Sequence, residues 1–177
     1  MRAMMLEDKA AKIKLLILDV DGVMTNGQIV INELGEEIKC FDVKDGQGLK
    51  LLMEAGVNVI IISGRKSKTV EYRSKDLGIK EVYQGINDKE SLCAELLEQK
   101  GLKPDQVCCI GDDLPDIPMF NRIGLPIAVA DAVAEVRNAA CYVTKNRGGN
   151  GAVREVCEII LKSQGIWTQI LSSFMGE

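Results

Sequence analysis

The chain contains no histidine among its 177 residues. Histidine is the commonest general base near neutral pH and a frequent ligand of zinc and iron. Its absence excludes the usual serine triad and most zinc or iron sites. Any catalysis by this chain must therefore use carboxylates, lysine, hydroxyl groups or cysteine.

Aromatic residues are also scarce, because Phe, Tyr and Trp together make up 4% of the sequence. Proteins that bind single-stranded nucleic acid stack bases on such side chains. The formal net charge of −4 further opposes the binding of polyanions in general. We therefore expect no nucleic-acid partner, although local basic groups could still bind one small phosphate.

Long apolar runs are missing as well. None approaches the roughly 20 residues that a membrane-spanning helix needs, and the first residues lack the apolar core and cleavage pattern of a signal peptide. We therefore expect no membrane contact and a cytoplasmic location. None of the six cysteines shows CxxC spacing and most lie in apolar segments, which favours buried free thiols over disulfides or a zinc site.

What the sequence does contain is a regular alternation of short apolar runs with helix-like stretches. The predicted strands are Leu15–Leu18, Val57–Ile62, Glu81–Tyr83, Val107–Ile110, Ile127–Val129 and Cys141–Val143. The predicted helices are 47–55, 66–77, 88–100, 116–122, 132–138 and 151–164, with Gly78 and Gly101 as C-caps. The alternation predicts an α/β fold with a doubly wound parallel sheet, and the length suits a single domain over 1–177.

The segment 27–43 breaks this alternation. Two strand-like stretches, 27–33 and 37–43, flank Leu34-Gly35-Glu36 and predict a β-hairpin inserted after the first strand. The apolar residues of this hairpin are Ile29, Ile31, Ile38 and Cys40. A lone hairpin is marginal in water, so something must cover this apolar face. Either the hairpin folds onto its own domain, or the hairpins of several subunits pack together.

The first predicted strand runs directly into Asp19-Val20-Asp21-Gly22. Open α/β folds bind their ligands at the carboxyl edge of the sheet, and alternation along an extended chain would project Asp19 and Asp21 toward one side. Two carboxylates so close repel each other unless a cation lies between them or one keeps a proton. The pair therefore indicates a metal site or an acid/base couple, although such a string also occurs as an ordinary turn.

Two further strand ends carry groups that can bind phosphate. Ser63-Gly64-Arg65 joins a hydroxyl to a glycine whose backbone N–H can hold a phosphate oxygen, although Ser63 could simply cap the next helix. Lys89 stands at a predicted helix start, where a cation opposes the helix dipole. It is therefore either functional or a solvated surface charge.

A last strand end carries three carboxylates, those of Asp112, Asp113 and Asp116. Like charges so close together suit a hard cation such as Mg2+, which prefers oxygen ligands, or else they cap a helix. Like the other candidate groups, they follow a predicted strand at its carboxyl end. Because those ends meet at one edge of a parallel sheet, we expect all four groups to lie close together.

In order and spacing, DVDGVMT, ISGR, Lys89 and GDDLPD resemble the haloacid dehalogenase superfamily of aspartate-nucleophile phosphatases. The resemblance implies that Asp19 attacks phosphorus to form an aspartyl-phosphate and that Asp21 protonates the leaving oxygen and later activates water. It implies that Ser63 and Lys89 hold the phosphoryl group. It implies an Mg2+ cofactor bound by Asp19, by Asp112 and by the backbone carbonyl of Asp21. It implies supporting roles for Thr25, Asp113 and Asp116, of which the two aspartates would orient either the metal shell or Lys89.

Many members of that superfamily insert a cap domain that closes the site. The stretch between Asp21 and Ser63 has room for a hairpin and one helix only, so we expect no cap domain here. An open site suits a macromolecular phosphoester, unless neighbouring subunits supply the walls. The oligomeric state therefore bears on the size of the substrate.

Five segments are also similar to 3-deoxy-D-manno-octulosonate 8-phosphate phosphatases: the hairpin, residues 41–48, 64–66 and 82–85, and the Gly-rich stretch 147–155. This similarity implies a homotetramer with a central barrel of hairpins and with sites completed by neighbouring subunits. It implies that the C-terminal part, about 147–177, closes over the pocket. The implied substrate contacts are Asp42, Val43, Lys44, Asp45, Gly46, Lys50, Gly64, Arg65 and Arg73.

The substrate would be an acidic sugar phosphate, whose carboxylate Arg65 or Arg73 could bind through paired N–H donors. Asp42 and Lys50 depart from the asparagine and arginine expected at these positions. A nine-carbon acid phosphate, of the ketodeoxynononate or sialate type, is therefore an alternative substrate. A receiver-like signalling domain is a further alternative from another class, but such domains keep the acidic pair and the phospho-accepting aspartate on different strands.

Overall fold

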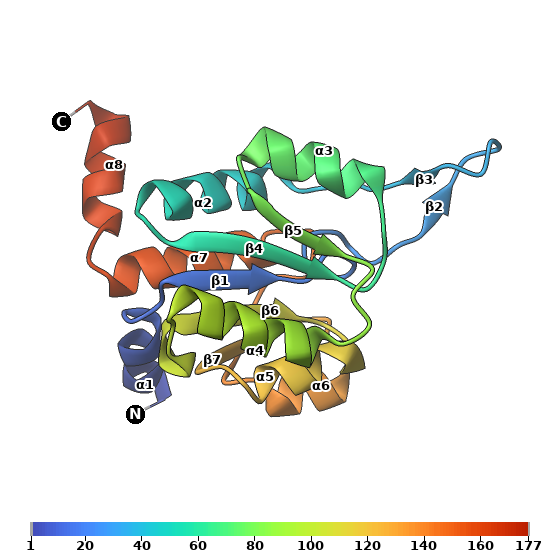
Figure 1. The fold of residues 1–177 in the computed structure, drawn as a ribbon. Helices are drawn as coiled ribbons and strands as arrows, with labels where there is room; N and C mark the ends of the chain where they lie inside the picture. Colours follow the sequence, from blue (N-terminus) through green and yellow to red (C-terminus); the bar gives the residue numbers. More distant parts are fainter. Residues whose placement is uncertain (1, 177) are drawn as a thin grey trace.

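The computed structural model describes residues 2–176 and contains a six-stranded parallel sheet with strand order β5-β4-β1-β6-β7-β8 (Figure 1). The strands are β1 (Leu15–Leu18), β4 (Asn58–Ser63), β5 (Glu81–Gln84), β6 (Val107–Gly111), β7 (Leu125–Ala128) and β8 (Tyr142–Val143). The chain winds outward from β1 first in one direction and then in the other, so a topological switch point lies at β1. The predicted doubly wound sheet is confirmed.

The register of the central strands explains why the candidate groups gather at one edge. All four residues of β1 are fully buried, as expected for a strand covered on both faces. Leu18 at the end of β1 pairs with Ile61 of β4 and Ile110 of β6. The residues that follow these strands therefore emerge next to one another at the carboxyl edge of the sheet.

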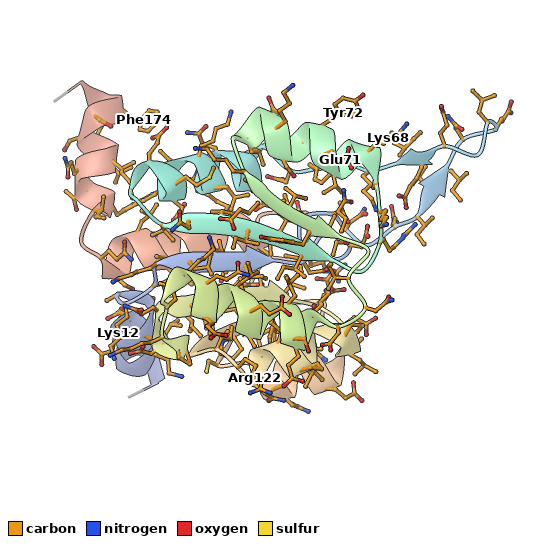
Figure 2. The ribbon with its side chains drawn as sticks, viewed as in Figure 1. Lys12, Lys68, Glu71, Tyr72, Arg122 and Phe174 are labelled. Atoms are coloured by element: carbon orange, nitrogen blue, oxygen red, sulfur yellow. The ribbon has the colours of Figure 1, made fainter. Side chains whose placement is uncertain are left out.

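Helices cover both faces of the sheet (Figure 1). On one face α2 (Val43–Glu54) contacts α3 (Lys68–Leu77) and α7 (Ala152–Ser163). On the other, α5 (Ile117–Phe120) contacts α4 (Lys89–Lys100) and α6 (Ala134–Ala139). Two further helices, α1 (Arg2–Ala10) and α8 (Trp167–Met175), were not predicted and lie toward the edge opposite the hairpin. Figure 2 shows Phe174 of α8 and Tyr72 of α3 at the outside of the molecule, where both are exposed.

Two short 3-10 turns lie at Pro104–Gln106 and Leu114–Asp116. Gly78 and Gly101 end α3 and α4 with φ angles of 82° and 60°. This left-handed region is the one that glycine adopts at little cost, so the predicted C-caps are confirmed.

The segment after the hairpin is helical earlier than predicted. The paired strands of the hairpin are only β2 (Val30–Ile31) and β3 (Glu37–Ile38), so the prediction of a strand over 37–43 is wrong beyond residue 38. Asp42 accepts hydrogen bonds from the backbone N–H groups of Lys44 at 2.6 Å and Asp45 at 3.0 Å. This N-cap starts α2 at Val43 rather than at residue 47.

The hairpin extends away from the domain, beyond the carboxyl edge of the sheet (Figure 1). Its apolar side chains are largely exposed: 61% for Ile29, 61% for Ile31 and 83% for Leu34. Of the two predicted arrangements, the single chain does not adopt the one in which the hairpin folds back onto its own domain. Exposed apolar surface of this kind is typical of sites at which proteins contact other molecules.

The cysteines are all free, and four of them are buried: Cys93, Cys108, Cys109 and Cys157. Cys40 and Cys141 are exposed. The prediction of free thiols is confirmed, with the difference that these two are not in the core. Among residues 2–176, every helix is too short or too polar to cross a lipid bilayer.

Candidate active site

The turn after β1 carries the first pair of candidate residues. Because β1 ends at Leu18, Asp19 and Asp21 lie in a turn, and the prediction that strand alternation orients them is wrong. Thr25 holds this turn: its Oγ1 donates to the carbonyl of Val20 at 3.3 Å and accepts from the N–H of Gly22 at 3.4 Å. Thr25, predicted as a supporting residue, therefore fixes the backbone that carries both aspartates.

Lys89 lies at the centre of the candidate site. Its Nζ donates to Oδ1 of Asp19 at 2.7 Å and to Oδ1 of Asp116 at 2.7 Å, and only 6% of its side chain is exposed. Burial lowers the pKa of Lys89, but the two facing carboxylates outweigh burial and hold this pKa above its ordinary value. Lys89 therefore carries a positive charge at any physiological pH and is not a solvated surface charge.

Asp116 links Lys89 to the loop after β6. Its second oxygen, Oδ2, accepts from the backbone N–H of Asp112 at 2.9 Å, and the residue is 1% exposed. A side chain at Gly111 would place Cβ 2.6 Å from Asp116, so only glycine leaves room for this arrangement. Asp113 is exposed and accepts from the N–H of Leu114 at 2.8 Å. Asp113 thus caps a turn, whereas Asp116 is a buried partner of Lys89.

Three carboxylates form a cluster that could hold a metal ion. Oxygen atoms of Asp19, Asp112 and Asp116 lie within 4.8 Å of one another. Burial raises the pKa of Asp112 to about 8, and the charges of Asp19 and Asp116 add to this effect. Burial likewise raises the pKa of Asp19 to about 6, while Lys89 acts in the opposite direction. A divalent cation would relieve this repulsion.

The backbone beside the cluster is shaped around Asp112. Gly22 has a φ of 95°, and a Cβ at this position would lie 2.0 Å from Oδ2 of Asp112. Only glycine therefore allows the carboxylate of Asp112 to lie against the turn that carries Asp19 and Asp21. With its all-oxygen donors, the site fits a hard cation such as Mg2+.

The carboxylate of Asp21 contacts Lys39, whereas the carboxylate of Asp19 contacts Lys89. Asp21 forms an ion pair with Lys39, whose side chain is 2% exposed. Lys39 also lies 3.4 Å from Glu37, and Glu37 lies 2.5 Å from Arg65. Sequence reasoning missed Lys39. The available signal was a lysine between Ile38 and Cys40, in a stretch predicted to have an apolar face.

The end of β4 places Ser63 and Gly64 beside this turn. Ser63 is 3% exposed, and its Oγ accepts from the N–H of Arg65 at 3.3 Å. Ser63 does not cap α3, because the N-cap of that helix is Ser67. Gly64 is exposed. The hydroxyl and the glycine backbone thus stand at the same sheet edge as the carboxylates.

The predicted substrate contacts 42–46 have other partners in this chain. Asp42 caps α2, as described above, while Val43 and Lys44 are exposed. Asp45 is 4% exposed and accepts from the backbone N–H groups of Gly151 at 3.3 Å and Arg154 at 2.7 Å. The structure therefore brings Asp45 to the start of α7 and not to the carboxylate cluster.

Arg73 also contacts this segment. Its NH2 donates to the carbonyl of Asp42 at 3.3 Å, and its guanidinium lies 5.9 Å from the centre of the Phe41 ring. A Cβ at Gly46 would lie only 2.3 Å from that NH2 group. Arg73 therefore supports the start of α2. Lys50 is half-buried on α2 and, among the described residues, forms no ion pair.

The Gly-rich segment lies against the turn after β1. The N–H of Gly149 donates to the carbonyl of Val23 at 2.8 Å, and that of Gly148 donates to Asp131 at 3.0 Å. A Cβ at Gly148 would lie 1.6 Å from the carbonyl oxygen of Gly22. The C-terminal part of the chain thus supports the turn that carries the two aspartates.

Comparison with known proteins agrees with this fold and geometry. Residues 81–156 match the family model of haloacid dehalogenase-like hydrolases. The 3-deoxy-D-manno-octulosonate 8-phosphate phosphatase of Yersinia pestis is 49% identical over 156 residues, which cover 88% of this chain and 83% of that protein. The Escherichia coli phosphatase of the same name is 47% identical over 157 residues, covering 89% of this chain and 84% of the relative.

A solved structure extends the comparison to bound ligands. The 3-deoxy-D-manno-octulosonate 8-phosphate phosphatase of Moraxella catarrhalis, in complex with magnesium, phosphate and KDO, superimposes with a TM-score of 0.93 and 41% identity, covering 96% of this chain and 97% of that one. The chain belongs to the haloacid dehalogenase-like hydrolases and, within them, to the family of these phosphatases.

Proposed function

We propose that the protein hydrolyses 3-deoxy-D-manno-octulosonate 8-phosphate to the free sugar acid and phosphate. The observation that carries this proposal is Lys89, a buried cation that bridges Asp19 and Asp116 beside the carboxylate of Asp112. Such a site combines a nucleophilic carboxylate with the positive charge that a phosphate dianion needs. The names of the similar phosphatases support the choice of sugar, as does the 3-deoxy-D-manno-octulosonate (KDO) bound to the Moraxella catarrhalis enzyme.

Mg2+ is the proposed cofactor, with Asp19, Asp112 and the backbone carbonyl of Asp21 as its protein ligands. Bound there, it would supply positive charge that offsets the repulsion between the carboxylate nucleophile and the phosphate dianion. Both oxygens of Asp116 already accept hydrogen bonds, from Lys89 and from the N–H of Asp112. We therefore assign Asp116 to holding Lys89 and the loop rather than to the metal.

The reaction proceeds in two displacements at phosphorus. First, an oxygen of Asp19 attacks phosphorus, the bond from phosphorus to the sugar oxygen breaks, and Asp21 donates a proton to that oxygen. Then Asp21 takes a proton from water, whose oxygen attacks phosphorus and releases phosphate with regeneration of Asp19. Ser63 and Lys89 bind the oxygens of the phosphoryl group throughout, and Lys89 also neutralises Asp19 when substrate is absent.

The active form is proposed to be a homotetramer in which hairpins of neighbouring subunits pack together. The exposed apolar side chains of the hairpin support this assembly: Ile29, Val30, Ile31, Leu34 and Ile38. A charge at the centre of this surface should prevent association, because an unpaired charge is costly to bury. Sedimentation of Ile31→Asp tests the assembly, and a tetramer formed by this variant would contradict it.

A single domain carries the proposed activity, because the carboxylates, Ser63 and Lys89 all lie at one edge of one sheet. The cytoplasm is the proposed location, a reducing compartment that suits six free thiols.

The decisive experiment is phosphate release from eight- and nine-carbon acidic sugar phosphates and from a neutral sugar phosphate, with Asp19→Asn as the control. We expect the eight-carbon acid phosphate to have the highest kcat/KM and the variant to be inactive with every substrate. A preference for the neutral sugar would refute the substrate, and an active Asp19→Asn protein would refute the mechanism. Chelation of divalent ions should remove the activity, and added Mg2+ should restore it.

A further inference from the structure

Lys39 is a buried cation outside the motifs that define the family site. It belongs to the hairpin, one residue after β3, yet only 2% of its side chain is exposed. Moving an ammonium group out of water is costly unless carboxylates face it. Lys39 has two such partners, Asp21 in the turn after β1 and Glu37 in β3.

These partners belong to a chain of charges that crosses the base of the hairpin. Arg65, in the loop after β4, contacts Glu37 at 2.5 Å, and Glu37 contacts Lys39 at 3.4 Å. Lys39 then contacts Asp21. Charges of alternating sign thus connect two loops at the sheet edge through the hairpin.

The orientation of the Asp21 carboxylate depends on this row of charged side chains. Within residues 2–176, Lys39 is the one side chain that donates a hydrogen bond to it. Asp19, by contrast, is held by Lys89 and is buried in the site. A carboxylate that must reach the leaving oxygen needs a fixed position, because small displacements are costly to catalysis.

We infer that Lys39 is a positioning residue that holds the carboxylate of Asp21 for proton transfer to the leaving group, and that Glu37 and Arg65 anchor Lys39. This inference rests on the proposed function, in which Asp21 is the acid/base residue. It assigns the hairpin a second role beside assembly, since a residue of the hairpin determines where the acid of the same subunit lies.

The consequence appears in the dependence on the leaving group. An oxygen that leaves as a stable anion needs no proton, whereas a more basic one does. Phenyl phosphate and p-nitrophenyl phosphate have nearly the same shape and lack sugar contacts, but phenol is much the weaker acid, with a pKa of about 10. Loss of a positioned acid therefore slows the hydrolysis of phenyl phosphate more than the hydrolysis of p-nitrophenyl phosphate.

The test is the ratio of kcat/KM for p-nitrophenyl phosphate to that for phenyl phosphate, measured on the full-length protein with its metal. We expect Lys39→Met to raise this ratio about 10-fold, in the same direction as Asp21→Asn, since general acids contribute about 100-fold or more. Lys39→Arg, which keeps the charge, should restore most of the wild-type ratio. Glu37→Gln should raise it to a smaller extent.

The matched control is Lys12→Met. Lys12 is exposed on the edge of the molecule opposite the hairpin (Figure 2), where, among the described residues, its side chain forms an ion pair with Asp105 alone, at 3.7 Å. This variant should keep the wild-type ratio. Sedimentation of every variant separates loss of assembly from loss of positioning, and Lys39→Arg and Glu37→Gln keep the test open if Lys39→Met does not fold.

The inference is overturned if folded Lys39→Met or Glu37→Gln slows both aryl phosphates equally or slows neither. The Asp19→Asn variant distinguishes this from failure of the proposed function. If Asp19→Asn still hydrolyses p-nitrophenyl phosphate, the phosphatase mechanism itself is wrong. If that variant is inactive while Lys39→Met keeps the wild-type ratio, only the role of Lys39 is refuted.

Discussion

Asp116 and Lys89 form a buried ion pair in which the second oxygen of Asp116 accepts a hydrogen bond from the backbone N–H of Asp112. One carboxylate thus orients the proposed phosphate-binding cation and the loop of a proposed metal ligand. The two functions are coupled, because a movement of Asp116 displaces both Lys89 and Asp112.

Asp116→Asn tests this coupling. The amide has one donor group, which must point either at Lys89 or at the N–H of Asp112, and both of these are donors. We expect kcat to fall about 10- to 100-fold, as for other residues that orient metal ligands, and the free energy of unfolding to fall by about 2 kcal/mol. Steady-state kinetics and urea unfolding measure these effects.

Asp105→Asn is the matched control, because its carboxylate is more than half exposed and pairs only weakly with Lys12. It should change neither quantity by much. Equal kinetics for Asp116→Asn and the wild type would contradict the coupling.

Gly148→Ala tests the contact between the Gly-rich segment and the turn after β1. Its Cβ would overlap the carbonyl oxygen of Gly22, so the turn that carries Asp19 and Asp21 must shift. We expect a large loss of kcat together with a lower melting temperature. Gly101→Ala is the comparison: it has a φ of 60° but no atom within 4 Å of the new Cβ. Its strain should cost about 1 kcal/mol of stability and leave kcat unchanged. Parallel loss of activity in both variants would point to global destabilisation instead.

Asp42→Asn tests whether the departure from the expected asparagine matters for the substrate. Asparagine and aspartate cap helices about equally well, because either side chain can accept from the N–H groups of Lys44 and Asp45. We expect Asp42→Asn to leave stability and KM for the acidic sugar phosphate nearly unchanged. Asp42→Ala should lower the free energy of unfolding by about 1 kcal/mol. A clear change in KM for Asp42→Asn would show instead that this carboxylate contacts the sugar.

The strand ends of the site were predictable because each joins a continuous apolar run to polar groups, as in Leu15–Leu18 followed by Asp19. The carboxyl ends of parallel strands meet at one edge of the sheet, so their proximity could be predicted even though the side-chain contacts could not. Lys89 was predictable for a different reason, since a cation at a helix start opposes the dipole. Its bond to Asp116 was one of the two roles expected of that aspartate, the other being to orient the metal shell.

Other contacts were not predictable, because they join residues that no local pattern relates. Asp45 and Arg154 are more than a hundred residues apart, and no periodicity indicates that one caps the helix of the other. The predicted start of α2 was wrong because Phe41 and Val43 favour a strand, whereas the N-cap made by Asp42 stabilises a helix from Val43 onward. Lys39 was missed because the alternation of the hairpin was interpreted only through its apolar residues.

Asp45 makes stability depend on pH in a way that one substitution can reveal. Burial raises the pKa of Asp45 from its ordinary value of 3.8 to about 6, although the N–H groups of Arg154 and Gly151 act in the opposite direction. The folded state therefore binds a proton more tightly than the unfolded state. The contribution of Asp45 to stability is fully present below its pKa in the unfolded state. It is lost as the pH rises through its pKa in the folded state.

Asp45→Asn removes this titration but keeps one hydrogen-bond acceptor for the start of α7. Between pH of about 4 and about 7, the free energy of unfolding of the wild type should fall by about 2 kcal/mol relative to the variant. Urea unfolding of both proteins across this range measures the difference, in which titrating groups that do not interact with Asp45 cancel. A difference independent of pH would show that Asp45 keeps its ordinary pKa, and then the hydrogen bonds from α7, rather than burial, would dominate its environment.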